Sequence, residues 1–396
     1  MKRVFYFNAL FDLLMSGGPE RAAVKRTADE MSVLIIPMGS TEDFCIVKSE
    51  FPKDYPLFLE DNGLDLPRLV NISERFSGNV TAHPWGWDGD AEKVFKTMGV
   101  NTFHPDFDIV KKINSREYCH QLSLIENIGV PNSVLLSSAS DIYNFFSDNT
   151  VFPLVIKPAH GNSGFGFIRV SESPDRTVTD KILQLVKNNI VITEPWLNRI
   201  MDISSSVDIC ADGSLSEIRH YRCLVDSRGT FFGVYLADGD SQLNRYTALL
   251  DSCVKNCAAY IYKSGYFGPV GFDSFVYLQK DGSEALAPII EINARHVMSD
   301  IARSLKNKLT PDKYVFYRLL SSKRAKLPEK YSQLKSILKK NLFSANTKKG
   351  ILPVTPLKNT TDVTRQPYRN AFFISAGSER ELFELDSFLM SSVCRR

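Results

Sequence analysis

Residues 271–293 limit the possible folds more than any other segment of this chain. Two runs rich in β-branched and aromatic residues, GFDSFVYL and ALAPIIEIN, flank an Asp-Gly dipeptide at 281–282. This pattern predicts an antiparallel β-hairpin with a tight turn. Glu291 and Asn293 are two residues apart on the second strand, so their side chains point to the same face of the sheet.

A glycine-rich loop lies upstream, after a predicted strand that carries a lysine. Residues 150–158, TVFPLVIKP, are rich in β-branched residues, and AHGNSGFG follows at 159–166. Glycines allow positive φ angles and close backbone approach, so N–H groups around Ser163 and Gly164 can point at phosphate oxygens. Lys157 can add a positive charge for the α- and β-phosphates. A plain turn would look similar, and no Gly-Lys-Ser/Thr follows, so this is not a Walker loop.

Three side chains on the predicted hairpin suit a divalent cation. Asp273 lies on the strand that pairs with the one carrying Glu291 and Asn293. Mg²⁺ prefers hard oxygen ligands, usually carboxylates with phosphate oxygens and water, and Mn²⁺ could take its place. Arg295 continues the same face and could reach a transferring phosphoryl group or a substrate carboxylate. A lone Glu-x-Asn would mean little, but the facing aspartate and the upstream loop favour a metal site.

The start of the chain alternates between strand-like and helix-like segments. Residues 4–7 and 32–37 look like buried parallel strands, with a helix-like stretch at 20–31 between them. Residues 91–99 predict a further helix that ends at a glycine. This alternation predicts an α/β domain over residues 1–110.

Two loops of that domain carry polar or aromatic residues. Residues 7–18 follow the first strand, and Asn8 and Asp12 in it lie where open α/β sheets bind ligands. Residues 83–90, HPWGWDGD, hold two tryptophans. These are either anchors of the core, which we favour, or part of a substrate-recognition loop.

Residues 111–320 predict an α+β unit with antiparallel strands. A helix is expected at 114–129, with Asn114 as its cap. Residues 203–237 predict a three-stranded meander that has Arg222 in its second strand. Arg222 either faces a cleft, where it would neutralise a triphosphate, or is a surface arginine.

The last part of the chain, residues 321–396, combines a basic segment with a predicted strand–strand–helix unit. Nine Lys/Arg and one acidic residue occupy 321–349. A basic amphipathic helix can bind anionic membranes or acidic partners. We favour the simpler interpretation of a surface helix packed through its apolar stripe.

Composition limits the classes of function. The length of 396 residues suggests two or three domains, and 43% apolar residues allow a sizeable core. A formal net charge of +3 is too small to indicate a nucleic-acid partner. The sequence has no run of about 18 apolar residues, so no transmembrane helix is predicted. The seven cysteines are scattered and odd in number, which argues against a secreted disulfide framework. We therefore expect a cytoplasmic protein without a nucleic-acid or membrane partner.

Three segments, taken in their order along the chain, resemble the motifs of the ATP-grasp superfamily. They are the loop at 155–167, the strip TEPWL at 193–197 and the segment 271–295. The resemblance implies an N-terminal α/β domain followed by a two-lobed α+β nucleotide domain that holds Mg-ATP between its lobes. Lys157 would be the lysine of the glycine-loop strand and Glu194 the hinge acid. Asp273, Glu291 and Asn293 would be the metal ligands.

The resemblance also implies an adenine and ribose site. Backbone groups near Trp196 and Leu197 would read the adenine edge, and their side chains would form apolar walls. Asp202 is favoured over Asp208 for the ribose hydroxyls. One departure concerns the helix before these strands, where the superfamily usually has a lysine and this chain offers Arg116.

Most enzymes of this superfamily join a carboxylate to an amine or another nucleophile through an acyl-phosphate. The resemblance therefore implies an ATP- and Mg²⁺-dependent ligase acting on small-molecule or peptide substrates. Two alternatives remain open, namely a phosphotransferase (kinase) and a non-catalytic nucleotide-binding protein. The sequence does not identify the substrates or the oligomeric state.

Overall fold

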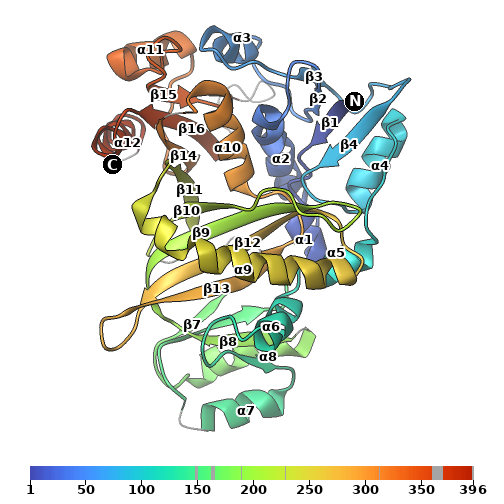
Figure 1. Ribbon diagram of the computed structural model, residues 1–396, viewed down its shortest axis with the longest axis vertical. Helices are drawn as coiled ribbons and strands as arrows, with labels where there is room; N and C mark the ends of the chain where they lie inside the picture. Colours follow the sequence, from blue (N-terminus) through green and yellow to red (C-terminus); the bar gives the residue numbers. More distant parts are fainter. Residues whose placement is uncertain are drawn as a thin grey trace.

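The computed structural model describes residues 1–147, 150–161, 166–188, 190–227, 229–311, 313–358 and 369–394. Within these residues the strands form one parallel sheet and two antiparallel sheets, with helices packed around them (Figure 1). Ser163 and Gly164 of the glycine-rich loop lie outside the described residues. No helix in the described part is long and apolar enough to cross a membrane.

The N-terminal domain is built on a parallel sheet, which confirms the predicted α/β arrangement. Its strand order is β3-β2-β1-β4, and both neighbours of β1 run parallel to it. The strands are β1 (Lys2–Tyr6), β2 (Phe44–Ile46), β3 (Arg68–Val70) and β4 (Val80–Pro84). The helices are α1 (Phe11–Met15), α2 (Ala22–Met31), α3 (Asp54–Asp61), α4 (Gly89–Met98) and α5 (Phe107–Ile113).

The prediction of a strand at 32–37 is wrong. These residues form η1 (Ser32–Met38), a 3₁₀ helix that continues directly from α2. Residues 32–37 are all buried because the segment packs against both β1 and α10 (Met298–Leu309). A short, continuously apolar run fits a buried helical segment as well as a buried strand, and β2 takes the place beside β1 instead.

A small lobe follows, made of a separate antiparallel sheet in the order β5-β8-β6-β7. Its strands are β5 (Val134–Leu136), β6 (Leu154–Pro158), β7 (Ile168–Val170) and β8 (Val191–Pro195). Helices α7 (Ala139–Ser147) and α8 (Arg176–Asn188) cover it, while α6 (Arg116–Ile125) contacts both β8 and the large sheet. The lobe has its own core around Ile142, Ile156 and Ile182, and lies at the bottom of Figure 1.

The large sheet is antiparallel and has the order β13-β12-β9-β10-β11-β14-β16-β15. The predicted meander is confirmed as β9 (Asn198–Ile209), β10 (Arg219–Val225) and β11 (Phe231–Leu236). The predicted hairpin is confirmed as β12 (Gly268–Leu278) and β13 (Glu284–Asn293). The remaining elements are α9 (Ser241–Lys263), β14 (Tyr314–Ser321), α11 (Tyr331–Leu338), η2 (Lys339–Asn341), β15 (Gly350–Pro353), β16 (Arg369–Ala376) and α12 (Glu379–Val393).

One hydrophobic core runs through both the N-terminal domain and the large sheet. The C-terminal strands β15 and β16 extend the large sheet next to β14, so residues after 321 pack as part of the same body. Helix α11 buries Tyr331, Leu334 and Leu338, as expected for a surface helix packed through its apolar stripe. The N-terminal domain therefore shares its interior with the sheet that carries Asp273 and Glu291, while the small lobe packs separately.

Candidate functional site

Two cavities that share lining residues lie where the small lobe faces the large sheet. The first, of about 210 Å³, is lined by Lys157 on β6 and by Asp273, Glu291 and Asn293 on the β12–β13 hairpin. Arg295, just after β13, also lines it. The fold thus brings residues from positions 157 to 295 to one place, as the sequence predicts for a phosphate and metal site.

Asp273 and Glu291 face each other directly. They are paired residues in the antiparallel register of β12 and β13, so their Cβ atoms are about 5 Å apart. Burial, with the charge of Glu291 as the next contribution, raises the pKa of Asp273 to about 7. Two carboxylates held this close repel each other, and a cation between them would relieve that repulsion.

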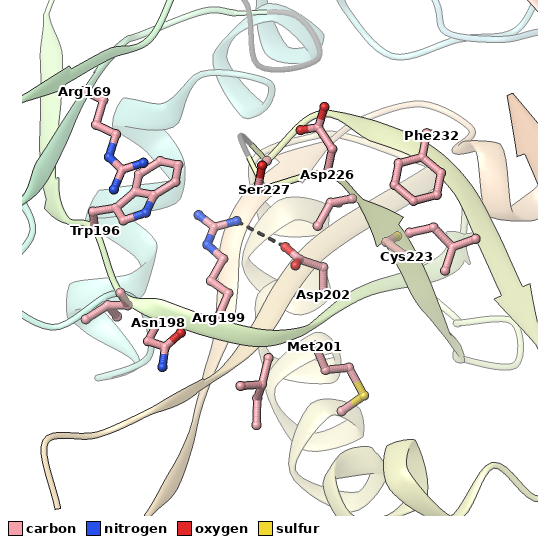
Figure 2. Close-up of a pocket in the computed structure, with 15 residues that line it drawn as sticks. Arg169, Trp196, Asn198, Arg199, Met201, Asp202, Cys223, Asp226, Ser227 and Phe232 are labelled. Atoms are coloured by element: carbon pink, nitrogen blue, oxygen red, sulfur yellow. Dashed lines mark hydrogen bonds and ion pairs between the residues drawn. The ribbon is translucent and has the colours of Figure 1, made fainter. Parts of the chain in front are cut away.

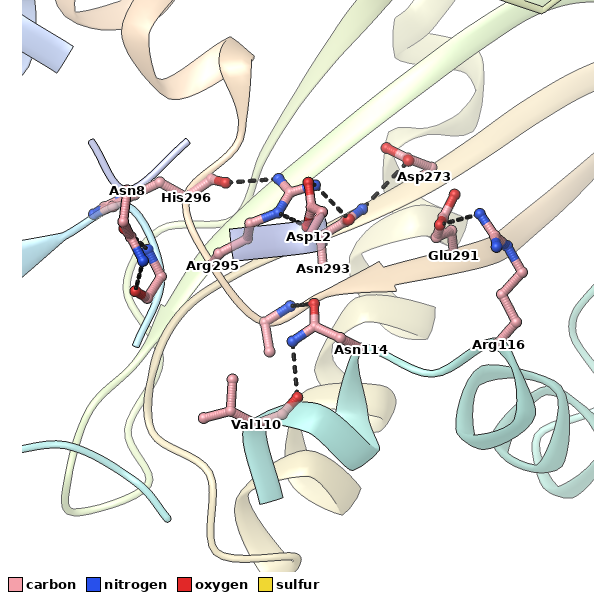
Figure 3. Close-up of polar contacts among 12 residues, drawn as sticks. Asn8, Asp12, Val110, Asn114, Arg116, Asp273, Glu291, Asn293, Arg295 and His296 are labelled. Carbon is pink, nitrogen blue, oxygen red and sulfur yellow. Dashed lines mark hydrogen bonds and ion pairs between the residues drawn. The ribbon is translucent and has the colours of Figure 1, made fainter. Parts of the chain in front are cut away.

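Asn293 links the Asp273 carboxylate to Arg295, as Figure 3 shows. Its Nδ2 donates to Asp273 Oδ2 at 3.3 Å, and its Oδ1 accepts from Arg295 Nη2 at 3.0 Å. Only an acceptor can face a guanidinium, which fixes the orientation of the amide. The two carboxylates are the charged oxygen ligands of the set. Asn293 holds Asp273 in place, and its own role as a ligand through Oδ1, which keeps a second lone pair, stays a prediction.

Arg295 is bound by the N-terminal domain. Its Nε donates to Asp12 Oδ1 at 2.8 Å and its Nη2 to Asp12 Oδ2 at 3.0 Å. A further bond runs from Nη1 to the carbonyl oxygen of His296 at 3.0 Å. Sequence reasoning placed Asp12 in a ligand-binding loop but missed this pair, because the two residues are 283 positions apart.

Arg116 occupies the position where the resemblance implied a lysine. Its Nη2 donates to Glu291 Oε1 at 2.7 Å and its Nη1 to the Pro158 carbonyl at 2.9 Å, so it bridges the small lobe and the metal strand. The cap of α6 is Ser115 rather than Asn114. Asn114 ends α5 instead, and its Oδ1 accepts from the backbone N–H of Ala294 at 2.9 Å.

Lys157 and Glu194 form a buried ion pair between neighbouring strands β6 and β8. Both side chains are less than 10% exposed. The ammonium of Lys157 also lies 5.7 Å from the ring centre of Phe167. The predicted hinge acid thus holds the predicted phosphate lysine at the wall of the first cavity.

A second cavity, of about 610 Å³, shares Arg199, Asp202 and Cys223 with the first, and Figure 2 shows residues that line it. Trp196, Leu197 and Asp202 line it, as expected for an adenine and ribose site. Arg169 lies 4.5 Å from the ring centre of Trp196. Arg199 donates to Asp202 Oδ1 at 3.1 Å, while burial raises the pKa of Asp202. Sequence reasoning missed both arginines, since neither belongs to a recognisable motif.

Arg222 does not join this group, which corrects its placement as a catalytic residue. Its Nε lies 2.6 Å from Asp240 Oδ2 and its Nη2 lies 3.1 Å from Glu379 Oε1. The guanidinium also stacks 3.9 Å from the ring centre of Tyr235. Neighbouring residues of a strand point to opposite faces, and it is Cys223 that lines both cavities.

The donor set suits a hard divalent cation, although the protein alone supplies few ligands. No group of three or more His, Cys, Asp or Glu that could hold a metal occurs among the described residues. Asp273 and Glu291 alone would leave most positions to phosphate oxygens and water. Mg²⁺ is usually bound in this way, through one or two carboxylates together with substrate phosphates.

Comparisons with known proteins identify the fold through solved structures rather than through sequence similarity. No protein-family model matches the chain, and no curated protein is significantly similar in sequence. Among solved structures, N5-carboxyaminoimidazole synthetase from Staphylococcus aureus, complexed with ADP, has a TM-score of 0.53 at 11% identity, covering 98% of this chain and 96% of that one. Biotin carboxylase from Campylobacter jejuni, complexed with β-γ-ATP, has a TM-score of 0.54 at 12% identity, covering 99% and 91%.

A third similar structure is the L-amino acid ligase from Bacillus licheniformis, with a TM-score of 0.52 at 12% identity, covering 99% of this chain and 98% of that one. These three proteins are ATP-grasp enzymes, and the similarity extends over nearly the whole of each chain. Identities this low establish the fold and nothing finer. The chain therefore has the ATP-grasp fold, as its glycine-rich loop and its Asp273–Glu291 hairpin predict.

Proposed function

We propose that the chain is an ATP- and Mg²⁺-dependent ligase that joins a carboxylate to an amine through an acyl-phosphate. The observation that carries this proposal is the pair Asp273 and Glu291, held face to face in a cavity whose other walls carry Lys157 and Arg295. Cationic and carboxylate side chains that line one cavity suit a metal-bound polyphosphate. Mn²⁺ could replace Mg²⁺ at such oxygen donors.

The site offers residues that could bind the phosphates of the nucleotide and others that could bind its adenine and ribose. Lys157 and Arg116 supply positive charge for the phosphates, and both lie within 6 Å of the Phe167 ring centre at the end of the glycine-rich loop. Trp196 and Leu197 offer apolar walls for adenine in the adjoining cavity. Arg199 bonds to Oδ1 of Asp202, so Oδ2 of that carboxylate can accept from the ribose hydroxyls.

The proposed reaction needs positioning and charge neutralisation rather than a protein nucleophile. A substrate carboxylate oxygen attacks the γ-phosphorus, the bond to the β–γ bridging oxygen breaks, and ADP leaves. The amine nitrogen then attacks the acyl carbon and loses a proton while inorganic phosphate departs. Mg²⁺ held by Asp273 and Glu291 would neutralise charge on the β- and γ-phosphate oxygens. The enclosing lobes would keep water from the acyl-phosphate.

The setting of the reaction is also a proposal. All seven cysteines lie in the described part of the chain and are free thiols. Free thiols are typical of reducing compartments, which supports the cytoplasm. We expect small-molecule or peptide substrates, and no feature of the site favours a nucleic acid.

The test is ADP release from Mg-ATP in the presence of pooled amino acids, dipeptides and small carboxylates, followed by mass spectrometry of the products. A ligase gives substrate-dependent ADP and a product one water lighter than the sum of its parts. A phosphorylated, unligated product would indicate a kinase instead. Binding of Mg-ATP without turnover on any pool would favour the non-catalytic alternative.

A further inference from the structure

The guanidinium of Arg295 is almost fully used within the protein. Arginine has five N–H donors, and four of those in Arg295 bind Asp12, Asn293 and the His296 carbonyl among the described residues. The side chain is only 15% exposed. Arg295 thus has little capacity left to bind a substrate carboxylate or a phosphoryl group directly.

A continuous chain of polar contacts leads from the N-terminal domain to the proposed metal site. It begins at Asp12 on α1, passes through Arg295 and then Asn293, and ends at Asp273. Each step after the first depends on the one before, because the guanidinium fixes the amide and the amide holds the carboxylate (Figure 3). Side chains that orient metal-binding carboxylates influence metal affinity without touching the metal.

We propose that Asp12 is a positioning residue for the metal-binding carboxylate of Asp273 and acts on it through Arg295 and Asn293. This inference rests on the proposed function, since it concerns the same Asp273–Glu291 pair. Asp12 binds the arginine side-on, accepting from Nε and Nη2 with one carboxylate oxygen each, which neutralises the guanidinium and orients it towards Asn293. Without Asp12, the nearest anions for the freed guanidinium are Asp273 and Glu291 themselves, so Arg295 would compete with the cation for them.

The backbone around Arg295 has supports of its own. The Ala294 N–H donates to Asn114 Oδ1 at 2.9 Å, and the His296 N–H donates to the Trp85 carbonyl at 2.9 Å. The loop that presents Trp85 is held by Asn8, whose Nδ2 donates to the Gly86 carbonyl at 2.8 Å. Removal of the Asp12 carboxylate therefore changes the side chains of Arg295 and Asn293 while the strand stays in place.

The test is the Mg²⁺ dependence of ATP binding, measured by isothermal titration calorimetry at a series of fixed Mg²⁺ concentrations. In Asp12→Ala and Asp12→Asn, the Mg²⁺ concentration that gives half-maximal ATP binding should rise about tenfold. This is the lower end of the loss in metal affinity that follows from mutating residues that orient metal ligands. Affinity for ATP at saturating Mg²⁺ should return towards the wild-type value. A variant that had lost its structure would not regain ATP affinity at high Mg²⁺ concentration.

Asp43→Ala is the matched control. Asp43 also accepts side-on from an arginine, with Arg3 Nε at 3.2 Å and Nη2 at 2.6 Å, and it belongs to the same parallel-sheet domain. Arg3 lies on β1, whereas Asp12 lies on α1, and neither Arg3 nor Asp43 lines the two cavities. Asp43→Ala should lower the melting temperature without shifting the Mg²⁺ dependence.

A double-mutant cycle tests whether the effect passes through Arg295. In an Arg295→Met background, Asp12→Ala should add no further change in Mg²⁺ dependence. An equal additional loss in that background, or a wild-type Mg²⁺ dependence in a folded Asp12 variant, would overturn the inference. If the wild-type protein bound no ATP at any Mg²⁺ concentration, the proposed function would fail first, and this inference with it.

Discussion

Arg116 at the start of α6 donates its Nη2 to Glu291 Oε1 at 2.7 Å, joining the helix before the small lobe to the strand that carries the proposed metal site. The same guanidinium donates through Nη1 to the Pro158 carbonyl at the end of β6. One planar group thus reaches the strand that leads into the glycine-rich loop and a metal-binding carboxylate together. An ammonium is a single point charge and cannot span both in this geometry.

Arg116→Lys should therefore bind Mg-ATP more weakly than the wild-type protein, although it keeps the charge. We expect Arg116→Ala to weaken binding further, by about tenfold or more, as for the loss of a hydrogen bond to a charged group. Calorimetric titration with Mg-ATP measures both variants. Wild-type affinity in Arg116→Ala would remove Arg116 from the phosphate site.

Glu291→Gln tests the metal site itself. The amide oxygen of glutamine still accepts from Arg116, so the contact between helix and strand survives while the negative charge is lost. We expect Mg²⁺-dependent ADP formation to fall below detection with little change in melting temperature. Glu284→Gln is the matched control, because Glu284 lies at the other end of β13 and contacts Tyr246 and Arg245. Normal turnover in a folded Glu291→Gln protein would rule out the proposed role.

Local patterns were sufficient to predict the hairpin and the meander. The Asp-Gly turn and the spacing of Glu291 and Asn293 depend only on neighbouring residues, and the structure pairs Asp273 with Glu291 accordingly. The run at 32–37 was misread because burial, rather than strand pairing, explains its apolar residues. The sequence left the role of Arg222 open, because the face of the sheet to which its side chain points depends on strand register, which the sequence alone does not determine.

The contacts of Asp12 and Asn114 that sequence reasoning missed share a physical reason. Both join elements far apart along the chain, and no local spacing predicts them. Asp12 reaches Arg295 across 283 positions, and Asn114 reaches Ala294 across 180. Such long-range pairs arise only when the N-terminal domain packs on the large sheet, so the ligand-bearing strand could be predicted but its supports could not.

The buried pair of Lys157 and Glu194 predicts an asymmetric effect of single and double substitutions. Lys157→Met removes the phosphate charge and leaves Glu194 buried without its partner, which costs about 3–5 kcal/mol of unfolding free energy. Lys157→Met combined with Glu194→Gln should recover much of that stability, since no unpaired charge is then buried. Nucleotide affinity should stay low in both proteins.

Urea unfolding gives the stability of these variants, and calorimetry gives their affinity for Mg-ATP. The comparison separates the two roles of Lys157, because only the stability should respond to the second substitution. A double variant that regained nucleotide binding would show that Lys157 does not contact phosphate.

Asp43 gives a pH-dependent prediction that is independent of the nucleotide site. Burial alone would raise its pKa, but hydrogen bonds from Arg3 and Ser40 outweigh that effect and hold the pKa below the usual value of 3.8. A carboxylate with a lowered pKa in the folded state stabilises the protein above its unfolded-state pKa and loses this contribution as the pH falls. At pH 7, Asp43→Asn should therefore lower the free energy of unfolding by about 2 kcal/mol. That difference should stay constant down to about pH 4 and shrink below it, because Asp43 of the unfolded wild-type protein then binds a proton that the folded protein does not. Urea unfolding of both proteins between pH 7 and pH 3 measures the difference, and a gap that widened towards pH 3 would contradict the assignment.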